Sequence, residues 1–214
     1  MSETTEEEIQ KKIHPSADRI AHLRHQVNER KEAARRVFRK SGTKPTERQL
    51  INEAGERLRQ EYESDYDPLT GLLEKRGYEK ERTKAVERAL REKIKASVAF
   101  IDLDELKTVN DTLGHEAGDQ LLKSAADAIR ASTRTTDIPA RIGGDEFQVF
   151  LMDTTPKLAE NWKKRLVEEM KLRNVSASIG LSGVDLNDVS ASVRTADQNM
   201  YKEKTRKKQE IKNG

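Results

Sequence analysis

Two acidic clusters, each beside an apolar run, contain the residues of this sequence best suited to chemistry. In the first, the glycines Gly143 and Gly144 are followed by Asp145 and Glu146, and short β-like runs lie on both sides. This pattern predicts a hairpin with two carboxylates at its tip. Glycine permits positive φ and a close approach of the backbone to a ligand, and carboxylate oxygens suit Mg²⁺ and Mn²⁺. The tip is therefore predicted to hold a metal ion and phosphate.

The second cluster ends a predicted buried strand. The apolar run of residues 96–101 is followed by Asp102 and Asp104, and ligands of α/β sheets usually bind beyond strand ends. If this strand lies beside the hairpin, Asp102 and Asp145 can share a cation. The alternative for the glycine pair and its two acids is an ordinary solvated hairpin turn. The alternative for an acid after a strand is an ordinary turn residue. The functional interpretation therefore depends on finding both clusters in one chain.

The elements that position these clusters follow from the periodicity of the apolar residues. From residue 67 onward we expect a turn and then strands alternating with helices, in the order β-α-β-β-α-β. The sequence thus predicts an α/β (α+β) fold with one antiparallel hairpin. The expected helices cover residues 76–91, a short stretch near 106, 118–132, 158–172, and 189 through the basic tail; the expected strands cover 96–102, the hairpin, and 175–183.

Composition limits the class of protein. The chain has 214 residues, of which 34% are hydrophobic and 37% charged, enough for one full domain and a modest appendage. No apolar run is long enough to span a membrane, and the acidic N-terminus is unlike a signal peptide, so we expect a cytoplasmic protein with no membrane partner. The absence of cysteine excludes disulfides and thiolate metal sites. A net charge of +3 from 41 basic and 38 acidic residues predicts no nucleic-acid partner.

Residues 1–66 are predicted to form a separate helical segment with a dimerisation or regulatory role. Ser16 is a candidate cap for a first helix that ends near Gly42, and Thr43 is a candidate cap for a second helix with Leu50 and Ile51 on its apolar face. Each apolar stripe is too narrow for an independent core. We therefore expect the segment to pack against a partner chain or against the second domain.

Histidines in this segment raise the question of a metal sensor. His22 and His25 are three residues apart and would share a helix face, with His14 further upstream. No fourth ligand is evident, so a solvated surface is favoured over a zinc site.

Five segments occur in an order typical of one family. Together they resemble the signature of GGDEF-domain diguanylate cyclases over residues 67–208, and several ordered motifs are far more specific than the hairpin alone. The resemblance implies a palm-like fold, related to nucleotidyl cyclases and polymerases, in a domain of residues 67–214. The segments are Asp67-Pro68-Leu69-Thr70-Gly71-Leu72, Phe100-Ile101-Asp102-Leu103-Asp104, Asn110 to His115 with Gly118-Asp119, Arg141 to Phe147, and Ser178-Ile179-Gly180.

The activity implied by this resemblance is the condensation of two GTP molecules into cyclic di-GMP with release of two pyrophosphates. A ribose 3′-hydroxyl attacks an α-phosphorus, and divalent cations offset the charge of the triphosphate. By resemblance, Mg²⁺ or Mn²⁺ is coordinated by Asp102, the Leu103 carbonyl, Asp145 and Glu146, and the last two are the catalytic residues. Each domain brings one GTP, so we expect a homodimer in which two sites meet.

The resemblance also implies how GTP is bound. Asn110 and Asp119 stand at the positions that recognise guanine, which needs both acceptors and a donor; aspartate at position 119 favours GTP over ATP. Each of these two residues is alternatively a helix cap. Gly143 and Gly144 would lie against the α-phosphate. The residues placed for the β- and γ-phosphates are Lys107, Lys204 and Lys208.

The last motif departs from the family pattern. Alanine usually precedes the lysine and Gly-Arg follows it, whereas this chain has Glu203 before Lys204 and then Lys207-Lys208. Lysine neutralises phosphate as a point charge but lacks the bidentate fork of arginine. Among the residues assigned by resemblance, Lys208 is therefore the one that differs in type from the family pattern. None of the departures removes a metal ligand.

A further motif lies upstream of the hairpin. Arg134 and Asp137 have the Arg-x-x-Asp form at the spacing of the family's product-inhibition site, where they would bind cyclic di-GMP, with Arg165 as a third contact. The ordinary alternative is an ion pair at a helix end. A catalytically silent cyclic di-GMP receptor or interaction protein is the alternative function, although intact Asp102, Asp145 and Glu146 argue against decay of the active site.

Overall fold

The computed structural model describes residues 31, 35, 46–53, 56 and 65–213, and the chain divides into two compact units, Met1–Tyr62 and Glu63–Gly214. In the first unit, residues 31, 35, 47–53 and 56 are helical. The first predicted helix lies almost wholly outside the described residues, as do His14, His22 and His25. Each helix in the described part of the chain is too short or too polar to cross a membrane.

The second predicted helix of the first unit begins at a different residue from the one expected. Thr46, not Thr43, is the cap: the Gln49 N–H donates to Thr46 Oγ1 at 3.3 Å, and the Thr46 N–H donates to Gln49 Oε1 at 2.9 Å. This reciprocal pair is a capping box, which satisfies two backbone donors at once. On the predicted apolar face Leu50 is buried, whereas Ile51 is half exposed.

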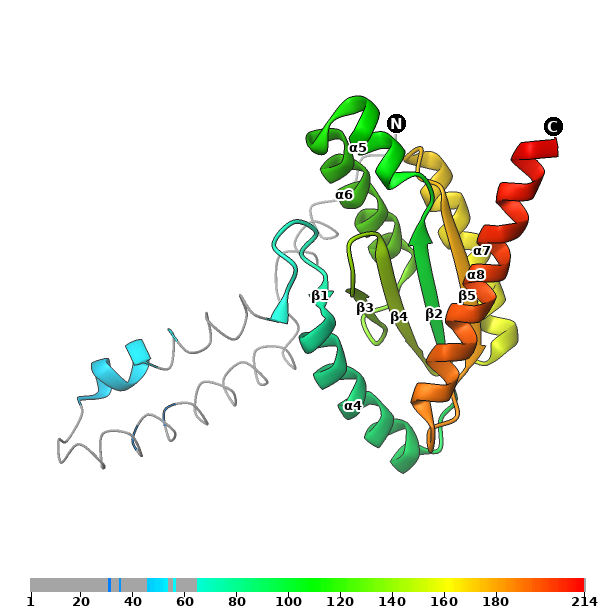
Figure 1. The fold of residues 1–214 in the computed structure, drawn as a ribbon. Helices are drawn as coiled ribbons and strands as arrows, with labels where there is room; N and C mark the ends of the chain where they lie inside the picture. The colour runs from blue at the N-terminus through cyan, green and yellow to red at the C-terminus, as the bar shows by residue number, and fades with distance from the viewer. Residues whose placement is uncertain (1–30, 32–34, 36–45, 54–55, 57–64, 214) are drawn as a thin grey trace, which may run out of the picture. The chain divides into compact units, whose positions relative to one another are not determined.

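The second unit is a five-stranded sheet with helices on both faces (Figure 1). The strand order is β1-β3-β4-β2-β5, with β2 antiparallel to both β4 and β5 and the short β1 parallel to β3. This confirms the predicted α+β fold and its central hairpin. The elements are β1 (Leu73–Glu74), α4 (Lys75–Glu92), β2 (Ala96–Leu103), α5 (Leu106–Leu113), α6 (His115–Ser132), β3 (Ile138–Arg141), β4 (Glu146–Met152), α7 (Pro156–Leu172), β5 (Ala177–Gly183) and α8 (Val189–Asn213).

The alternation of side chains along the central strands divides the core. One face of the sheet carries Ile101 and Phe147 and packs against apolar residues of α6 and α7, such as Ile129 and Trp162. The other face carries Val98 and Phe100 opposite α8, and a further cluster of β4 residues opposite α4. Because Asp102 has the parity of Val98 and Phe100, its carboxylate belongs to the α8 face. The sheet thus presents the acidic strand end to α8.

The outer edge of β5 is covered by side chains of α8. Asn199 Nδ2 donates to the Leu181 carbonyl at 3.0 Å, the Ile179 N–H donates to Glu203 Oε1 at 3.3 Å, and Lys207 Nζ donates to the Ala177 carbonyl at 2.6 Å. Four helical residues rise about 6.0 Å and two strand residues about 6.6 Å. Every fourth residue of α8 therefore meets every second residue of the edge strand, and the edge is closed to pairing with another strand.

Gly180 allows α8 to lie directly on β5. A Cβ atom at this position would lie 1.9 Å from the Ala196 carbonyl oxygen and 2.2 Å from the Met200 backbone nitrogen. These contacts are with backbone atoms, so no side-chain rotation relieves them. The close approach brings Asn199, Glu203 and Lys207 of α8 within hydrogen-bonding distance of β5.

We expect Gly180→Ala to lower the free energy of unfolding by roughly 2–3 kcal/mol, because the added methyl group forces α8 away from the sheet. Urea unfolding followed by circular dichroism measures the change. Gly144→Ala is the matched control, since a Cβ there meets no atom within 4 Å, and its effect should stay within about 0.5 kcal/mol. Equal stability of the two variants would contradict this account of the helix packing.

Candidate active site

Strand pairing brings the two predicted acidic clusters together. Asp102 on β2 is the Cα partner of Glu146 on β4, so their side chains share one face of the sheet. The Leu103 N–H donates to the Asp145 carbonyl at 3.0 Å, which joins the hairpin tip to the end of β2. The juxtaposition of Asp102 with the hairpin acids, expected only if the strand and hairpin were neighbours, is thus present.

The two glycines of the tip act differently from the prediction. Neither Gly143 nor Gly144 takes a positive φ, so that reason for their presence was wrong. A Cβ on Gly143 would lie 2.7 Å from Glu146 Oε2, and the glycine therefore leaves room for the folded-back carboxylate. At Gly144 the added atom would meet open space, which leaves this backbone accessible.

Arg141 and Asp67 hold the tip in place, a function that the sequence did not reveal. Arg141 donates to the Gly144 carbonyl through Nη2 at 2.8 Å and through Nε at 3.2 Å. Its Nη1 also lies 3.1 Å from Asp67 Oδ2. Asp67 in turn accepts from the Thr70 N–H and hydroxyl at 2.8 and 2.6 Å. Burial alone would raise the pKa of Asp67, but the bonds from Thr70 and the charge of Arg141 lower it.

The electrostatics of the strand-end acids favour a cation. Burial raises the pKa of Asp102; its ion pair with Lys204 acts in the opposite direction, and the nearby Asp145 and Asp104 raise it further. The pKa of Glu146 is raised by burial first and then by Asp145 and Asp102. A divalent ion would relieve this repulsion. Two hard carboxylates and the Leu103 carbonyl fit Mg²⁺ or Mn²⁺ chemically, although no three Asp, Glu, His or Cys side chains of the described residues are grouped to hold one ion.

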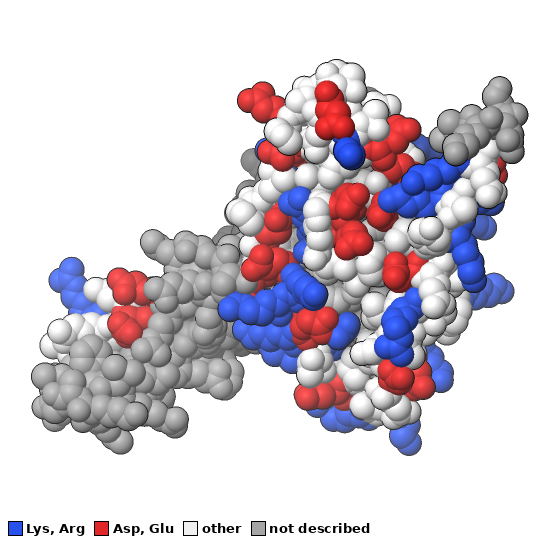
Figure 2. All heavy atoms as spheres, in the orientation of Figure 1, with Lys and Arg blue, Asp and Glu red and all other residues white. Residues whose placement is uncertain are grey.

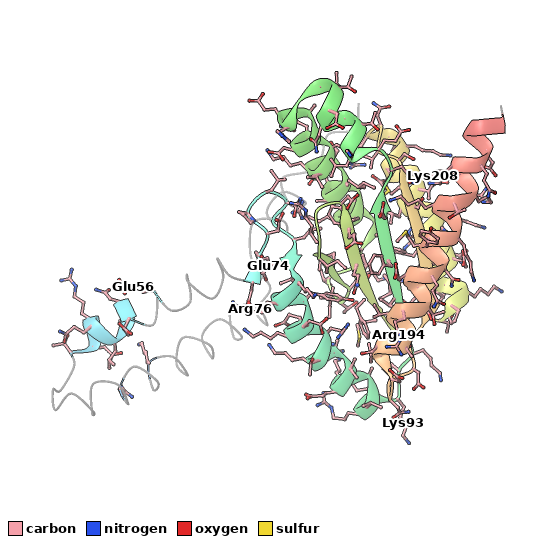
Figure 3. All side chains as sticks on the ribbon, in the orientation of Figure 1. Glu56, Glu74, Arg76, Lys93, Arg194 and Lys208 are labelled. Atoms are coloured by element: carbon pink, nitrogen blue, oxygen red, sulfur yellow. The ribbon has the colours of Figure 1, made fainter. Side chains whose placement is uncertain are left out.

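Two cavities lie against these acids. Figure 2 shows acidic side chains gathered near the upper end of the sheet, with basic side chains beside them along α8. A cavity of about 580 Å³ is bounded by Asp102, Glu146 and Asp197 together with α8. Lys208, labelled on α8 in Figure 3, borders both cavities and is exposed. The other cavity, of about 700 Å³, is lined among others by Leu103, Asp145, Lys107, Lys204, Lys207 and Lys208.

Asp104 anchors the larger cavity. Its carboxylate accepts hydrogen bonds from the Ser176 and Ser178 hydroxyls at 2.7 and 2.8 Å and from Lys207 Nζ at 2.9 Å. Burial alone would raise the pKa of Asp104, but the bonds from Ser176, Lys207 and Ser178 lower it. No role was predicted from the sequence for Asp104 or Lys207. The only available signal was their position beside assigned residues.

Asn110 and Asp119 lie within helices, so the alternative that each caps a helix was wrong. Asn110 is inside α5, and Asp119 is inside α6, whose N-cap is Gly114. A Cβ on Gly118 would lie 1.9 Å from Asn110 Oδ1, so the amide rests on the glycine that precedes Asp119. Asp119 is exposed. Neither residue, nor Gly143 or Gly144, lines the two cavities beside the acids.

The residues of the Arg-x-x-Asp motif form a separate site. Arg134, Asp137 and Arg165 border one small cavity of about 90 Å³, together with Trp162. The Asp137 carboxylate accepts from the backbone N–H groups of Arg134 and Met152 at 2.8 and 3.2 Å. Burial raises the pKa of Asp137 despite these bonds. The three predicted residues are therefore neighbours. Part of the hydrogen-bonding capacity of the Asp137 carboxylate is used by the backbone N–H groups of Arg134 and Met152.

The fold and the strand-end acids define a palm-like α+β domain. Comparison with known families gives a match to "Diguanylate cyclase, GGDEF domain" over residues 64–210. The chain therefore belongs to the GGDEF domain family, as the resemblance implied.

Named relatives and solved structures agree with this membership. "Probable diguanylate cyclase DgcJ" of Escherichia coli K12 is 32% identical over 146 residues, covering 66% of this chain and 29% of that protein. "Diguanylate cyclase DgcS" of Shewanella oneidensis is 45% identical over 86 residues, covering 40% of this chain and 29% of that protein. The chain thus spans less than a third of the length of these relatives.

Among solved structures, diguanylate cyclase SiaD of Pseudomonas aeruginosa, in complex with its activator SiaC, has a TM-score of 0.62 at 28% identity. It covers 87% of this chain, and this chain covers 72% of it. A sensory box/GGDEF family protein of Caulobacter crescentus has a TM-score of 0.58 at 28% identity, covering 66% and 98% of the two chains.

Glu146→Gln should stabilise the fold in the absence of metal. The raised pKa of Glu146 means that its ionised form destabilises the folded state above that pKa, and this destabilisation disappears as the pH falls below the ordinary value. We expect a higher melting temperature at about pH 7.5 and no difference at about pH 4. Thermal unfolding of protein treated with EDTA measures this. Glu160→Gln, at an exposed position of α7, is the control, and a pH-independent effect of Glu146→Gln would contradict the electrostatic cause.

Proposed function

We propose that this protein is a diguanylate cyclase that condenses two GTP molecules into cyclic di-GMP and two pyrophosphates. The observation that carries the proposal is the meeting of Asp102, Asp145 and Glu146 at one strand end, beside a cavity of about 700 Å³ lined by four lysines. Such a site has hard ligands for a cation next to positive charge for a polyphosphate. Membership in a family whose relatives are named diguanylate cyclases adds the reaction type.

The residues divide the work of the reaction. Asp102, Asp145 and the Leu103 carbonyl are the proposed metal ligands, and the bound Mg²⁺ or Mn²⁺ supplies charge neutralisation at the triphosphate. Glu146 is the proposed acceptor for the proton of the attacking 3′-hydroxyl. Its raised pKa brings it closer to the working pH, as a general base requires. Lys204 pairs with Asp102 in this structure and is the proposed partner of the phosphates once a cation has replaced it.

Recognition of the guanine base is assigned to residues of α5 and α6. Asn110 and Asp119 are the proposed guanine contacts. Their amide and carboxylate groups match the N1 and N2 hydrogens and the O6 acceptor of the guanine base. The Asn110 amide of α5 rests on Gly118 of α6, and the exposed Asp119 follows that glycine in the chain. Gly144 has open space beside it and is the proposed α-phosphate contact, with Gly143, while Lys107 and Lys208 complete the phosphate site.

A homodimer is proposed because each domain binds one GTP and two must react. Effective concentration within a dimer replaces a slow encounter of separate domains. The helical residues of the first unit are the proposed dimerisation element, and cyclic di-GMP bound at Arg134, Asp137 and Arg165 is the proposed inhibitor.

Incubation of the purified protein with GTP and Mg²⁺ is expected to yield cyclic di-GMP, detected by chromatography with mass analysis. Asp145→Asn should lower turnover by about 100-fold or more, since it removes a hard ligand. Asp153→Asn, at an exposed position after β4, should leave turnover unchanged. No product at high protein concentration, combined with tight cyclic di-GMP binding, would instead support a silent receptor; no nucleotide binding at all would support an interaction module.

Trp162 gives a direct test of the product site, because it is the sole tryptophan of the chain and it borders the cavity with Arg134 and Arg165. We expect added cyclic di-GMP to change its fluorescence and to slow turnover. Arg134→Ala should weaken both effects about 10-fold or more, the loss of a charged hydrogen bond, while leaving uninhibited turnover intact.

Arg173→Ala is the control for this test, since Arg173 pairs with Glu169 away from the cavity. Inhibition that is unchanged in Arg134→Ala would exclude this site from product control.

A further inference from the structure

Lys207 is a cation of the larger cavity that the family pattern does not supply. It lies on α8, between Lys204 and Lys208, and lines the cavity of about 700 Å³ together with Lys107. Its ammonium donates to Asp104 Oδ2 at 2.9 Å and to the Ala177 carbonyl at 2.6 Å, while Glu203 Oε1 is 3.8 Å away. An ammonium has three donors. Two are used, and the Glu203 contact is too long for a hydrogen bond.

We propose that Lys207 is a further binding residue for the β- and γ-phosphates of the triphosphate, through its third N–H. This inference rests on the proposed function, since it concerns the same substrate. Two fixed acceptors hold the ammonium at the wall of the cavity, so little side-chain entropy is lost when phosphate arrives. Lys208, by contrast, is exposed and must be ordered by the ligand.

The arrangement also compensates for the absence of arginine in the last motif. An arginine would give two donors in a fixed fork, whereas a lysine gives a single point charge. Lys207 and Lys208 together give two ammonium groups beside one cavity. The first is fixed by Asp104, and the second is free to follow the substrate.

The contacts of Asp104 are compatible with a phosphate role for Lys207. It already accepts from Ser176 and Ser178 at 2.7 and 2.8 Å, so its carboxylate does not depend on Lys207 alone. Phosphate can therefore share the ammonium without leaving a buried charge unpaired.

The test compares ligands that differ only in their phosphates. With Mg²⁺ present, calorimetry measures the affinity of the protein for 3′-deoxy-GTP, which cannot react, for inorganic tripolyphosphate, and for GMP. Lys207→Gln keeps a donor for the Ala177 carbonyl and removes the charge. We expect its affinity for 3′-deoxy-GTP and tripolyphosphate to fall about 10-fold, as for loss of a charged hydrogen bond, with that for GMP unchanged.

Two companion variants make the result decisive. Lys207→Arg should restore triphosphate affinity to within about 3-fold of the parent, since the charge returns. Lys202→Gln, at an exposed position of α8 that does not line the cavity, should have no effect. Unchanged triphosphate affinity in Lys207→Gln, or an equal loss for GMP, would overturn the proposal in favour of a structural role.

The outcome can be separated from that of the proposed function. If the parent protein makes no cyclic di-GMP but Lys207→Gln loses affinity for tripolyphosphate, the phosphate role of Lys207 stands and the cyclase proposal fails. If cyclic di-GMP is made and Lys207→Gln binds tripolyphosphate as the parent does, the cyclase proposal stands and the phosphate role fails.

Discussion

The crowding of carboxylates at the end of β2 is the constraint on which the rest of the site depends. Strand register fixes Asp102 directly opposite Glu146, and like charges in this arrangement repel. Burial raises the pKa of both groups further. The opposite face of the same strands holds the arrangement, because Ile101 and Phe147 are buried in the core against α6 and α7. The sheet thus keeps unfavourable charge in place, and a bound cation would relieve it.

The helix α8 supplies the positive charge that offsets these carboxylates. It carries Lys204 to the Asp102 carboxylate, and it can do so only because Gly180 lets its backbone lie on β5. The contacts of Glu203 and Lys207 with β5 then fix the position of α8 along the strand. The same position of α8 therefore both closes the sheet edge and places the lysines. A shift of α8 by one turn, about 5.4 Å, would undo both.

Much of the fold could be predicted because its central strands are long and apolar and its helices are periodic. The short strand β1 was missed, since two residues carry no period of their own. α6 begins three residues earlier than expected, at His115 and not Gly118, because Gly114, at φ 86°, forms the sharp turn between the helices. The cap at Thr43 was wrong because Thr46 has the partner, Gln49, that completes a capping box. Local chemistry decides such boundaries within a few residues.

The site itself could be predicted only where a residue acts by its own chemistry. Acidic residues after a strand and at a hairpin tip indicate a cation site without knowledge of neighbours, whereas the contacts of Asp104 with Ser176 and Ser178 span more than 70 residues and exist only after β2 and β5 pair. The same holds for Glu203 and Lys207. Read along the sequence, they are only departures from a family motif. In the folded domain they lie one helical turn apart, and both bind the edge strand. The two residues therefore act together: Glu203 secures α8 on the edge strand, and Lys207 brings a fixed positive charge to the cavity.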